Sequence, residues 1–168
     1  GAGVDTIVLT ANNQTVVDAA FANKTLIEAI STANGTNSLT LGTNAAAATA
    51  NLTVTGGTGN DTIDASDLGA AVNIAGGAGA NVLTGSNQAD TITGGSDGDT
   101  ITGGAGADSL NGGSGNDVFV YANLAEFIPS NAVVDSVDGG DGSGDTIRID
   151  DGITLTTSNS LARVSLVE

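Results

Sequence analysis

Apolar residues recur every nine positions between Gly56 and Tyr121. Each nine-residue unit has a large apolar residue at its eighth position, and polar or small residues usually flank it. Such a triplet predicts a short β-strand with one inward side chain. A flexible Gly/Asp-rich linker has no reason to keep this spacing, so the pattern favours a folded repeat. The eighth positions are Ile63, Leu83, Ile92, Ile101, Leu110 and Phe119.

The first six positions of each unit follow the pattern G-G-x-G-x-D and predict a turn, because glycine readily adopts positive φ. Two units make one full coil, so turns eighteen residues apart stack on one edge at about the 4.8 Å strand spacing. The spacing from Gly56 to Gly76 is two residues longer than two units, which predicts a degenerate coil at Ala65–Ala75. The units read GGTGNDTID from Gly56, then without a gap GGAGANVLT, GSNQADTIT, GGSDGDTIT, GGAGADSLN and GGSGNDVFV from Gly76.

The flanks predict less regular coils. Alternating, β-branched segments favour strands, whereas Thr15–Ala22 favours a short helix and Ala45–Ala48 a surface loop or helical turn. The strands are expected at Thr6–Thr10, Leu26–Ser31, Ser38–Leu41 and Leu52–Thr55.

The repeat breaks after Tyr121 in a segment that contains the only proline, Pro129, and a candidate helix at Asn123–Ile128. It resumes with GGDGSGDTI at Gly139–Ile147. Asp5–Glu28 also resembles Asp145–Glu168 at an offset of 140 residues, which favours a larger array of such units. The expected division is irregular solenoid coils at 1–55, a β-roll at 56–121, an excursion at 122–138, and at 139–168 a continuation that is a candidate start of the next unit.

Charge and composition narrow the function. The 168 residues include 19 acidic and 3 basic side chains, which gives a net charge of −16, and they lack His and Cys. This excludes thiol and imidazole chemistry and makes nucleic acid an unsuitable partner, because phosphate binding needs clustered Lys and Arg. No apolar run has the length of a membrane span. Paired carboxylates can serve a glycosidase, but the chain has few aromatic residues to hold a sugar, so no catalytic residue is assigned.

The acidic residues of the turns predict a calcium-binding array. No basic residue lies between Lys24 and Arg148, where most of the carboxylates are. Stacked carboxylates repel unless a cation lies between them, and Ca²⁺ accepts carboxylate and carbonyl oxygens in flexible geometry. About four or five ions are expected from the same-edge pairs. The candidate ligands are Gly57, Gly59, Asp61, Gly77, Gly79, Asn81, Asp90, Gly95, Asp97, Asp99, Gly104, Gly106, Asp108, Gly113, Gly115, Asp117 and Asp145.

Alternate units share an edge, so one edge is expected to pair Asp61 with Asn81, Asn81 with Asp99, and Asp99 with Asp117. The other edge is expected to pair Asp90 with Asp108, and Asp108 with Asp145. Sites at Asn81 are expected to be weaker because an amide oxygen has no charge. The turn at Gly85 has Ser86 and Gln88 where glycines are expected, and Asp97 replaces a glycine in the next turn, so incomplete coordination is expected at both turns.

These units resemble the RTX family, the haemolysin-type calcium-binding repeats of proteins exported by bacterial type I secretion. The resemblance implies an all-β fold, a right-handed parallel β-roll or β-solenoid with Ca²⁺ between its turns. It also implies that the chain folds on calcium outside the cell, with Asp61, Asp90, Asp99, Asp108 and Asp117 among the ligands. Residues 21–57 are similar, more weakly, to connecting stretches of RTX-containing S-layer and giant surface proteins.

The function expected from these features is a non-catalytic structural module of an exported bacterial surface protein, an S-layer protein or an adhesin. The alternative is a C-terminal calcium-folding and secretion module of a type I secreted hydrolase. Calcium is the expected cofactor, and self-association or surface polysaccharide are the candidate partners. The expected location is outside the cell or on the bacterial surface.

Overall fold

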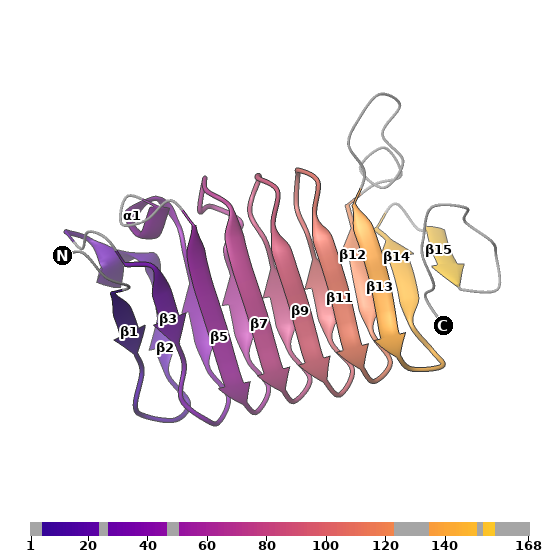
Figure 1. The fold of residues 1–168 in the computed structure, drawn as a ribbon, viewed down its shortest axis with the longest axis horizontal. Helices are drawn as coiled ribbons and strands as arrows, with labels where there is room; N and C mark the ends of the chain where they lie inside the picture. Colours follow the sequence, from indigo (N-terminus) through magenta and orange to yellow (C-terminus); the bar gives the residue numbers. More distant parts are fainter. Residues whose placement is uncertain (1–4, 24–26, 47–50, 123–134, 151–152, 157–168) are drawn as a thin grey trace.

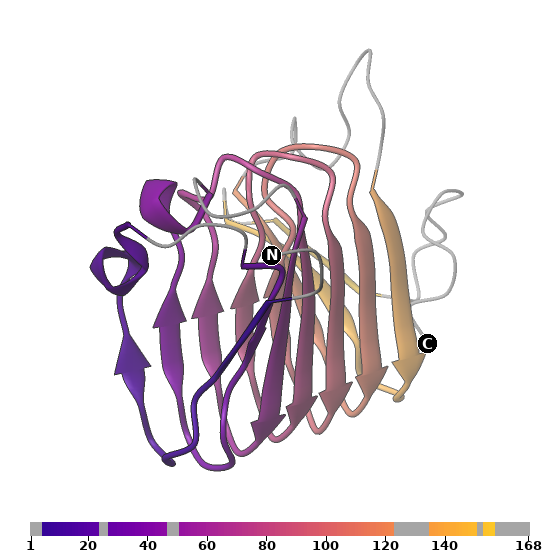
Figure 2. The same ribbon diagram turned by 60° about the vertical axis from the view of Figure 1, so that its left-hand side comes forward.

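The computed structural model describes residues 5–23, 27–46, 51–122, 135–150 and 153–156. The chain winds into a solenoid whose two sheets face each other (Figures 1 and 2). Neighbouring strands are parallel, with one exception described below. This confirms the predicted all-β parallel solenoid.

Seven strands form the first sheet, here called sheet A. Each of its strands pairs with the strand one coil further along the chain, so the sheet order follows the sequence. In chain order they are β1 (Thr6–Val8), β3 (Ala29–Ser31), β5 (Leu52–Thr58), β7 (Val72–Ala78), β9 (Thr91–Ser96), β11 (Ser109–Ser114) and β13 (Ser136–Asp141).

Eight strands form the second sheet, sheet B. The last of them, β15, pairs antiparallel with β14, so it does not form a further parallel coil. In chain order they are β2 (Thr15–Val16), β4 (Ser38–Thr40), β6 (Thr62–Asp64), β8 (Val82–Thr84), β10 (Thr100–Thr102), β12 (Val118–Tyr121), β14 (Thr146–Ile149) and β15 (Ile153–Thr156).

The core lies between the sheets and is made by the apolar residue of each strand triplet. In sheet B the register aligns Leu39, Ile63, Leu83, Ile101 and Phe119, and each is at most 1 % exposed. Burial of such a side chain contributes about 1.5–3 kcal/mol. All six predicted eighth-position residues therefore lie in the core, as predicted.

Coil length varies, and the extra residues lie in the connections between strands. Thr91 of β9 pairs with Ser109 of β11, eighteen residues further along the chain. Ser109 in turn pairs with Ser136 of β13, so this coil is longer. Leu52 pairs with Val72, which confirms the two-residue insertion before Gly76. The parallel ladder tolerates these insertions because the strand register repeats after each of them.

The flanking predictions are confirmed in part. All four predicted strands form, as β1, β3, β4 and β5. The expected helix at Thr15–Ala22 is instead strand β2 followed by a 3₁₀ helix, η1 (Asp18–Phe21), in which only Phe21 is buried. The Ala-rich segment begins with a short helix, α1 (Thr43–Ala46), and Ala45 is buried, so a purely surface loop is wrong there. The candidate helix at Asn123–Ile128 lies outside the described residues.

Candidate metal centre

Two edges of the solenoid carry the turns. The first edge joins each strand of sheet A to the next strand of sheet B, and it lies at the bottom of Figure 1. The second edge carries the turns that return to sheet A. The sixth position of each turn, which directly precedes a strand, forms a column along its edge.

On the first edge the column side chains are buried and hydrogen-bonded to the neighbouring coil. Oδ1 of Asp99 accepts a hydrogen bond from the N–H of Asn81 at 2.7 Å, and Oδ1 of Asp117 accepts one from Asp99 at 2.7 Å. Oδ1 of Asp145 accepts one from Asp117 at 2.8 Å. Each column residue therefore fixes the coil that precedes it. The column contains Asn37, Asp61, Asn81, Asp99, Asp117 and Asp145, each at most 2 % exposed.

The second carboxylate oxygen has no partner in four of these residues. Oδ2 of Asp61, Asp99, Asp117 and Asp145 is buried and has no hydrogen-bond donor. A buried carboxylate oxygen without a partner is costly, because burial removes the water that would solvate it. These oxygens therefore require a partner from outside the chain.

Glycines make room around these oxygens. A Cβ added to Gly94 would lie 2.5 Å from the carbonyl oxygen of Gly112 and closer still to Oδ2 of Asp99. A Cβ added to Gly139 would lie 2.5 Å from Oδ2 of Asp145. Only glycine leaves this space free, and it is bordered by carboxylate and carbonyl oxygens.

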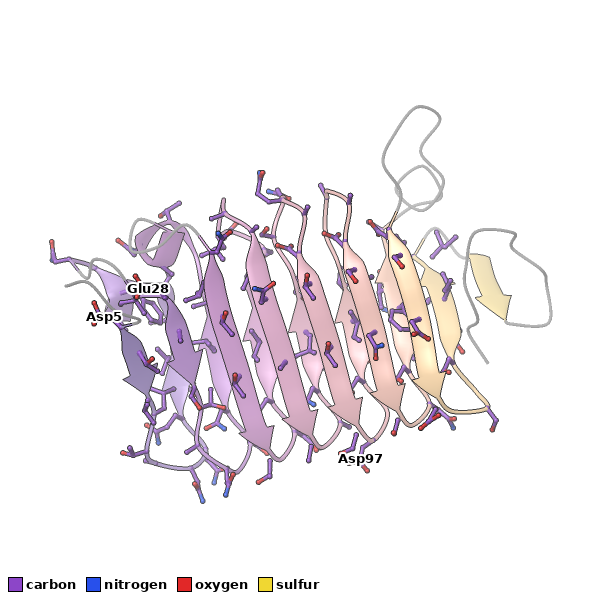
Figure 3. The ribbon with its side chains drawn as sticks, in the orientation of Figure 1. Asp5, Glu28 and Asp97 are labelled. Carbon is purple, nitrogen blue, oxygen red and sulfur yellow. The ribbon has the colours of Figure 1, made fainter. Side chains whose placement is uncertain are left out.

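The remaining predicted glycines shape the turns. All of them have a positive φ, which directs successive peptide groups around the turn. Asp97 stands at a glycine position and also has a positive φ, of 71°. Its side chain is exposed on the first edge, where Figure 3 labels it, and its Oδ2 accepts a hydrogen bond from Gly79 at 3.1 Å. The nine predicted glycines with a positive φ are Gly57, Gly59, Gly77, Gly79, Gly95, Gly104, Gly106, Gly113 and Gly115.

The second edge differs from the prediction. Asp90 and Asp108 do pair, because the N–H of Asp90 donates to Oδ1 of Asp108 at 2.8 Å. The expected pair of Asp108 and Asp145 is wrong. The N–H of Asp108 donates to Asp135 at 2.9 Å, and Asp145 lies on the first edge. Asp145 lies between β13 of sheet A and β14 of sheet B, so its turn belongs to the first edge.

Ser86 satisfies the carboxylate of Asp90 internally. Its N–H donates to Oδ2 of Asp90 at 2.5 Å, and its hydroxyl lies 3.0 and 3.1 Å from the two carboxylate oxygens. Ser86, which stands where a glycine is expected, therefore adds a hydroxyl contact to Asp90 that a glycine could not make. Asp90 needs no external partner, unlike the aspartates of the first edge.

The charges of the first-edge aspartates are not balanced by basic side chains among the described residues. Among the described residues the ion pair found is Arg148–Asp150, which is exposed and lies outside the columns. Burial, with repulsion from Asp117 and Asp97, raises the pKa of Asp99 to about 6 from its usual 3.8. Burial and repulsion from Asp145 likewise raise the pKa of Asp117. The column is therefore electrostatically strained at neutral pH.

Three members of the columns were not identified from the sequence. Asn37 belongs to the degenerate unit TANGTNSLT, in which the glycine at the fourth position and the leucine at the eighth remain as signals. Asp135 begins a D-x-V-D segment directly before a Gly-Gly pair. Glu28 lies beside Asp5 at the end of the second-edge column, where its carboxylate accepts a hydrogen bond from the Asp5 N–H at 2.7 Å (Figure 3).

These features fit calcium. Within the described ranges no group of three or more acidic side chains converges on one point, so carboxylates alone do not make a site. The oxygen-rich space between successive turns provides carbonyl oxygens as well, and Ca²⁺ accepts both kinds of oxygen. The fit rests on the unpartnered Oδ2 atoms and on the glycine cradle around them.

Comparison with known proteins agrees with this chemistry. The family described as RTX calcium-binding nonapeptide repeat (4 copies) matches residues 53–67, 73–101 and 93–122. No match was found among curated proteins or among solved structures. None of the helices in the described part of the chain has the length and apolar character needed to cross a membrane. Residues 53–67 and 73–122 thus match the repeats of the RTX family, which are calcium-binding structural modules typical of exported proteins.

Proposed function

We propose that this chain is a non-catalytic, calcium-folded structural segment of an exported bacterial surface protein, an S-layer protein or an adhesin. The observation that carries the calcium part is the row of buried Oδ2 atoms on the first edge without a hydrogen-bond donor. The sequence similarity at an offset of 140 residues supports a larger array of similar units, which suits a surface protein.

On the first edge the carboxylates of Asp61, Asp99, Asp117 and Asp145, with turn carbonyls, are the proposed ligands. On the second edge the proposed ligands are Asp108 and Asp135. Of the remaining predicted ligands, Gly57, Gly59, Gly95, Asp97, Gly104, Gly106, Gly113 and Gly115 belong to these same turns, whereas Gly77 and Gly79 belong to the turn of Asn81, and Asp90 to a turn of its own. A bound cation supplies positive charge to these oxygens, and about four or five ions at two charges each would offset half or more of the charge of −16.

Without calcium, the ordering of the glycine-rich turns and the burial of carboxylates oppose folding. With calcium at extracellular concentrations, weak sites of this type fill and favour the stacked coils, because binding and folding are coupled. The same charge would keep the chain open inside the cell, where free calcium is low. Folding would then follow export.

The non-catalytic assignment is supported by the use of the buried carboxylates. Each first-edge aspartate already holds the backbone of the preceding coil through Oδ1, which is a structural role. Self-association or binding to surface polysaccharide are the proposed partner interactions. Light scattering with and without calcium, and binding assays with cell-wall glycans, would test them.

Circular dichroism of the chain in EGTA, in Ca²⁺ and in Mg²⁺ tests the central part of the proposal. Addition of Ca²⁺ should increase the strand signal, whereas Mg²⁺ should not, because Mg²⁺ demands smaller and more regular coordination. Identical spectra in EGTA and in Ca²⁺ would contradict the proposal.

A further inference from the structure

Asn37 occupies the first-edge column next to Asp61, and its amide orientation is fixed by the backbone. Its Oδ1 accepts a hydrogen bond from the N–H of Gln14 at 3.0 Å. Because an N–H group can donate only to the oxygen, the other end of the amide must be Nδ2. This places an NH₂ group on the side of the turn where the aspartates of the column have Oδ2.

The Nδ2 group of Asn37 reaches oxygens of two coils at once. It donates to the carbonyl oxygens of Ala33 and Gly35, each at 2.7 Å, and to Oδ1 of Asp61 at 2.9 Å. Ala33 and Gly35 stand at the second and fourth positions of their turn. The amide therefore gathers two turn carbonyls and a carboxylate of the next coil, which are the oxygen types proposed for the metal.

Asn81, two coils further along the first-edge column, repeats part of this arrangement. Oδ1 of Asn81 accepts a hydrogen bond from Asp61 at 2.9 Å, and its Nδ2 donates to the carbonyl oxygen of Gly79 at 2.8 Å, again at the fourth position. A Cβ on Gly76 would lie 2.8 Å from this Nδ2, just as a Cβ on Gly139 would meet Oδ2 of Asp145. The amide nitrogen thus stands where an aspartate has its unpartnered oxygen.

We propose that the side-chain amides of Asn37 and Asn81 replace calcium in their turns, and that Asn37 ends the metal column. An amide is neutral and brings its own donors, so the turn carbonyls gain partners without any cation. The hydroxyl of Thr32 acts in the same sense, because it donates to the carbonyl oxygen of Gly56 on the next coil. The coils around Asn37 then stack without calcium, whereas those of Asp99, Asp117 and Asp145 need it.

This inference rests on the proposed calcium function, and aspartate substitutions test it in the full chain. Asn37→Asp removes the donors and adds a carboxylate beside Asp61, which should create a new calcium position. Asn81→Asp does the same within an intact glycine turn and serves if Asn37→Asp fails to fold. Asn34→Asp is the matched control, since Asn34 belongs to the same turn as Asn37 but is exposed.

Native mass spectrometry in Ca²⁺ counts the bound ions. Each of Asn37→Asp and Asn81→Asp should bind one more Ca²⁺ than the wild type, and Asn34→Asp should bind the same number. In EGTA with sucrose, which favours the folded chain, the urea midpoint of Asn37→Asp should fall below that of Asn34→Asp, and Ca²⁺ should reduce this difference.

The two proposals fail in different ways. If the wild type binds no Ca²⁺, the calcium function itself is wrong. If the wild type binds Ca²⁺ but both aspartate variants bind the same number of ions as Asn34→Asp, the amides do not replace the cation and the inference is overturned.

Discussion

Replacement of Asp99 by asparagine should have opposite effects with and without calcium. Asp99 is 1 % exposed, its Oδ1 holds the N–H of Asn81, and its Oδ2 has no donor. Asn in this position keeps the Oδ1 acceptor, removes the charge and gains an amide that can donate to the turn, as Asn81 does. We therefore expect the substitution to stabilise the metal-free coil and to remove a proposed calcium ligand.

The magnitude follows from the pKa and from linkage. With the pKa of Asp99 raised to about 6 from 3.8, keeping it ionised in the folded chain at pH 7 costs at most about 3 kcal/mol. Asp99→Asn should thus raise the free energy of unfolding in EGTA by about 1–3 kcal/mol. In Ca²⁺ at about 100 times the Kd, a site contributes about 2.7 kcal/mol, so its loss should lower stability by about that amount.

Urea denaturation followed by circular dichroism measures both effects. Samples in EGTA contain sucrose, which favours the folded chain by its exclusion from the protein surface. Asp67→Asn is the control, because Asp67 is exposed and lies outside both columns, so its change should stay within about 0.5 kcal/mol under both conditions. If Asp99→Asn shifts the midpoint in the same direction with and without Ca²⁺, the assignment of Asp99 as a calcium ligand is refuted.

Three further predictions concern the first-edge column, the glycine cradle and the pH dependence of stability. Asp99→Ala should be about 1–3 kcal/mol less stable than Asp99→Asn in urea titrations in EGTA with sucrose, because both changes remove the charge but only alanine leaves the buried N–H of Asn81 without an acceptor; equal stabilities would contradict the ladder. Gly139→Ala should lower Ca²⁺ affinity in calorimetric titrations, since its Cβ would lie 2.5 Å from Oδ2 of Asp145, whereas Gly69→Asn should not, since Gly69 has a φ of +54° and nothing within 4 Å. In EGTA with sucrose the stability should rise as the pH falls from about 6 towards 3.8, because burial raises the pKa of Asp99 and the folded chain binds a proton that the unfolded chain releases. Asp99→Asn should reduce this rise, and an equal rise in the variant would show that Asp99 does not contribute to it. In Ca²⁺ the affinity should instead fall over the same range, because protons compete with the metal for the carboxylates.

The core follows directly from the sequence. An apolar residue at each eighth position can be buried only if each triplet is a strand facing the same interior, so Ile63, Ile101 and Phe119 were placed correctly without coordinates. The turn glycines were also predictable, because the positive φ angles now seen at Gly77 and Gly113 are available chiefly to glycine. Local rules determine these features, and the nine-residue period repeats them.

The distribution of residues between the two edges depended on the tertiary structure. Each half coil added by an insertion moves the following turns to the opposite edge, and the number of half coils in a long excursion cannot be read from its sequence. Asp145 therefore lies beside Asp117, and it is Asp135 that lies beside Asp108, where Asp145 was expected. The hydrogen bonds of Asn37 and Ser86 could not be predicted from the sequence either, because they involve carbonyls and carboxylates that come together only in the folded, stacked coils. The sequence by itself determined the core, the turns and the resemblance to calcium-binding repeats, whereas stacking decided which carboxylate oxygens are left without a hydrogen-bond donor.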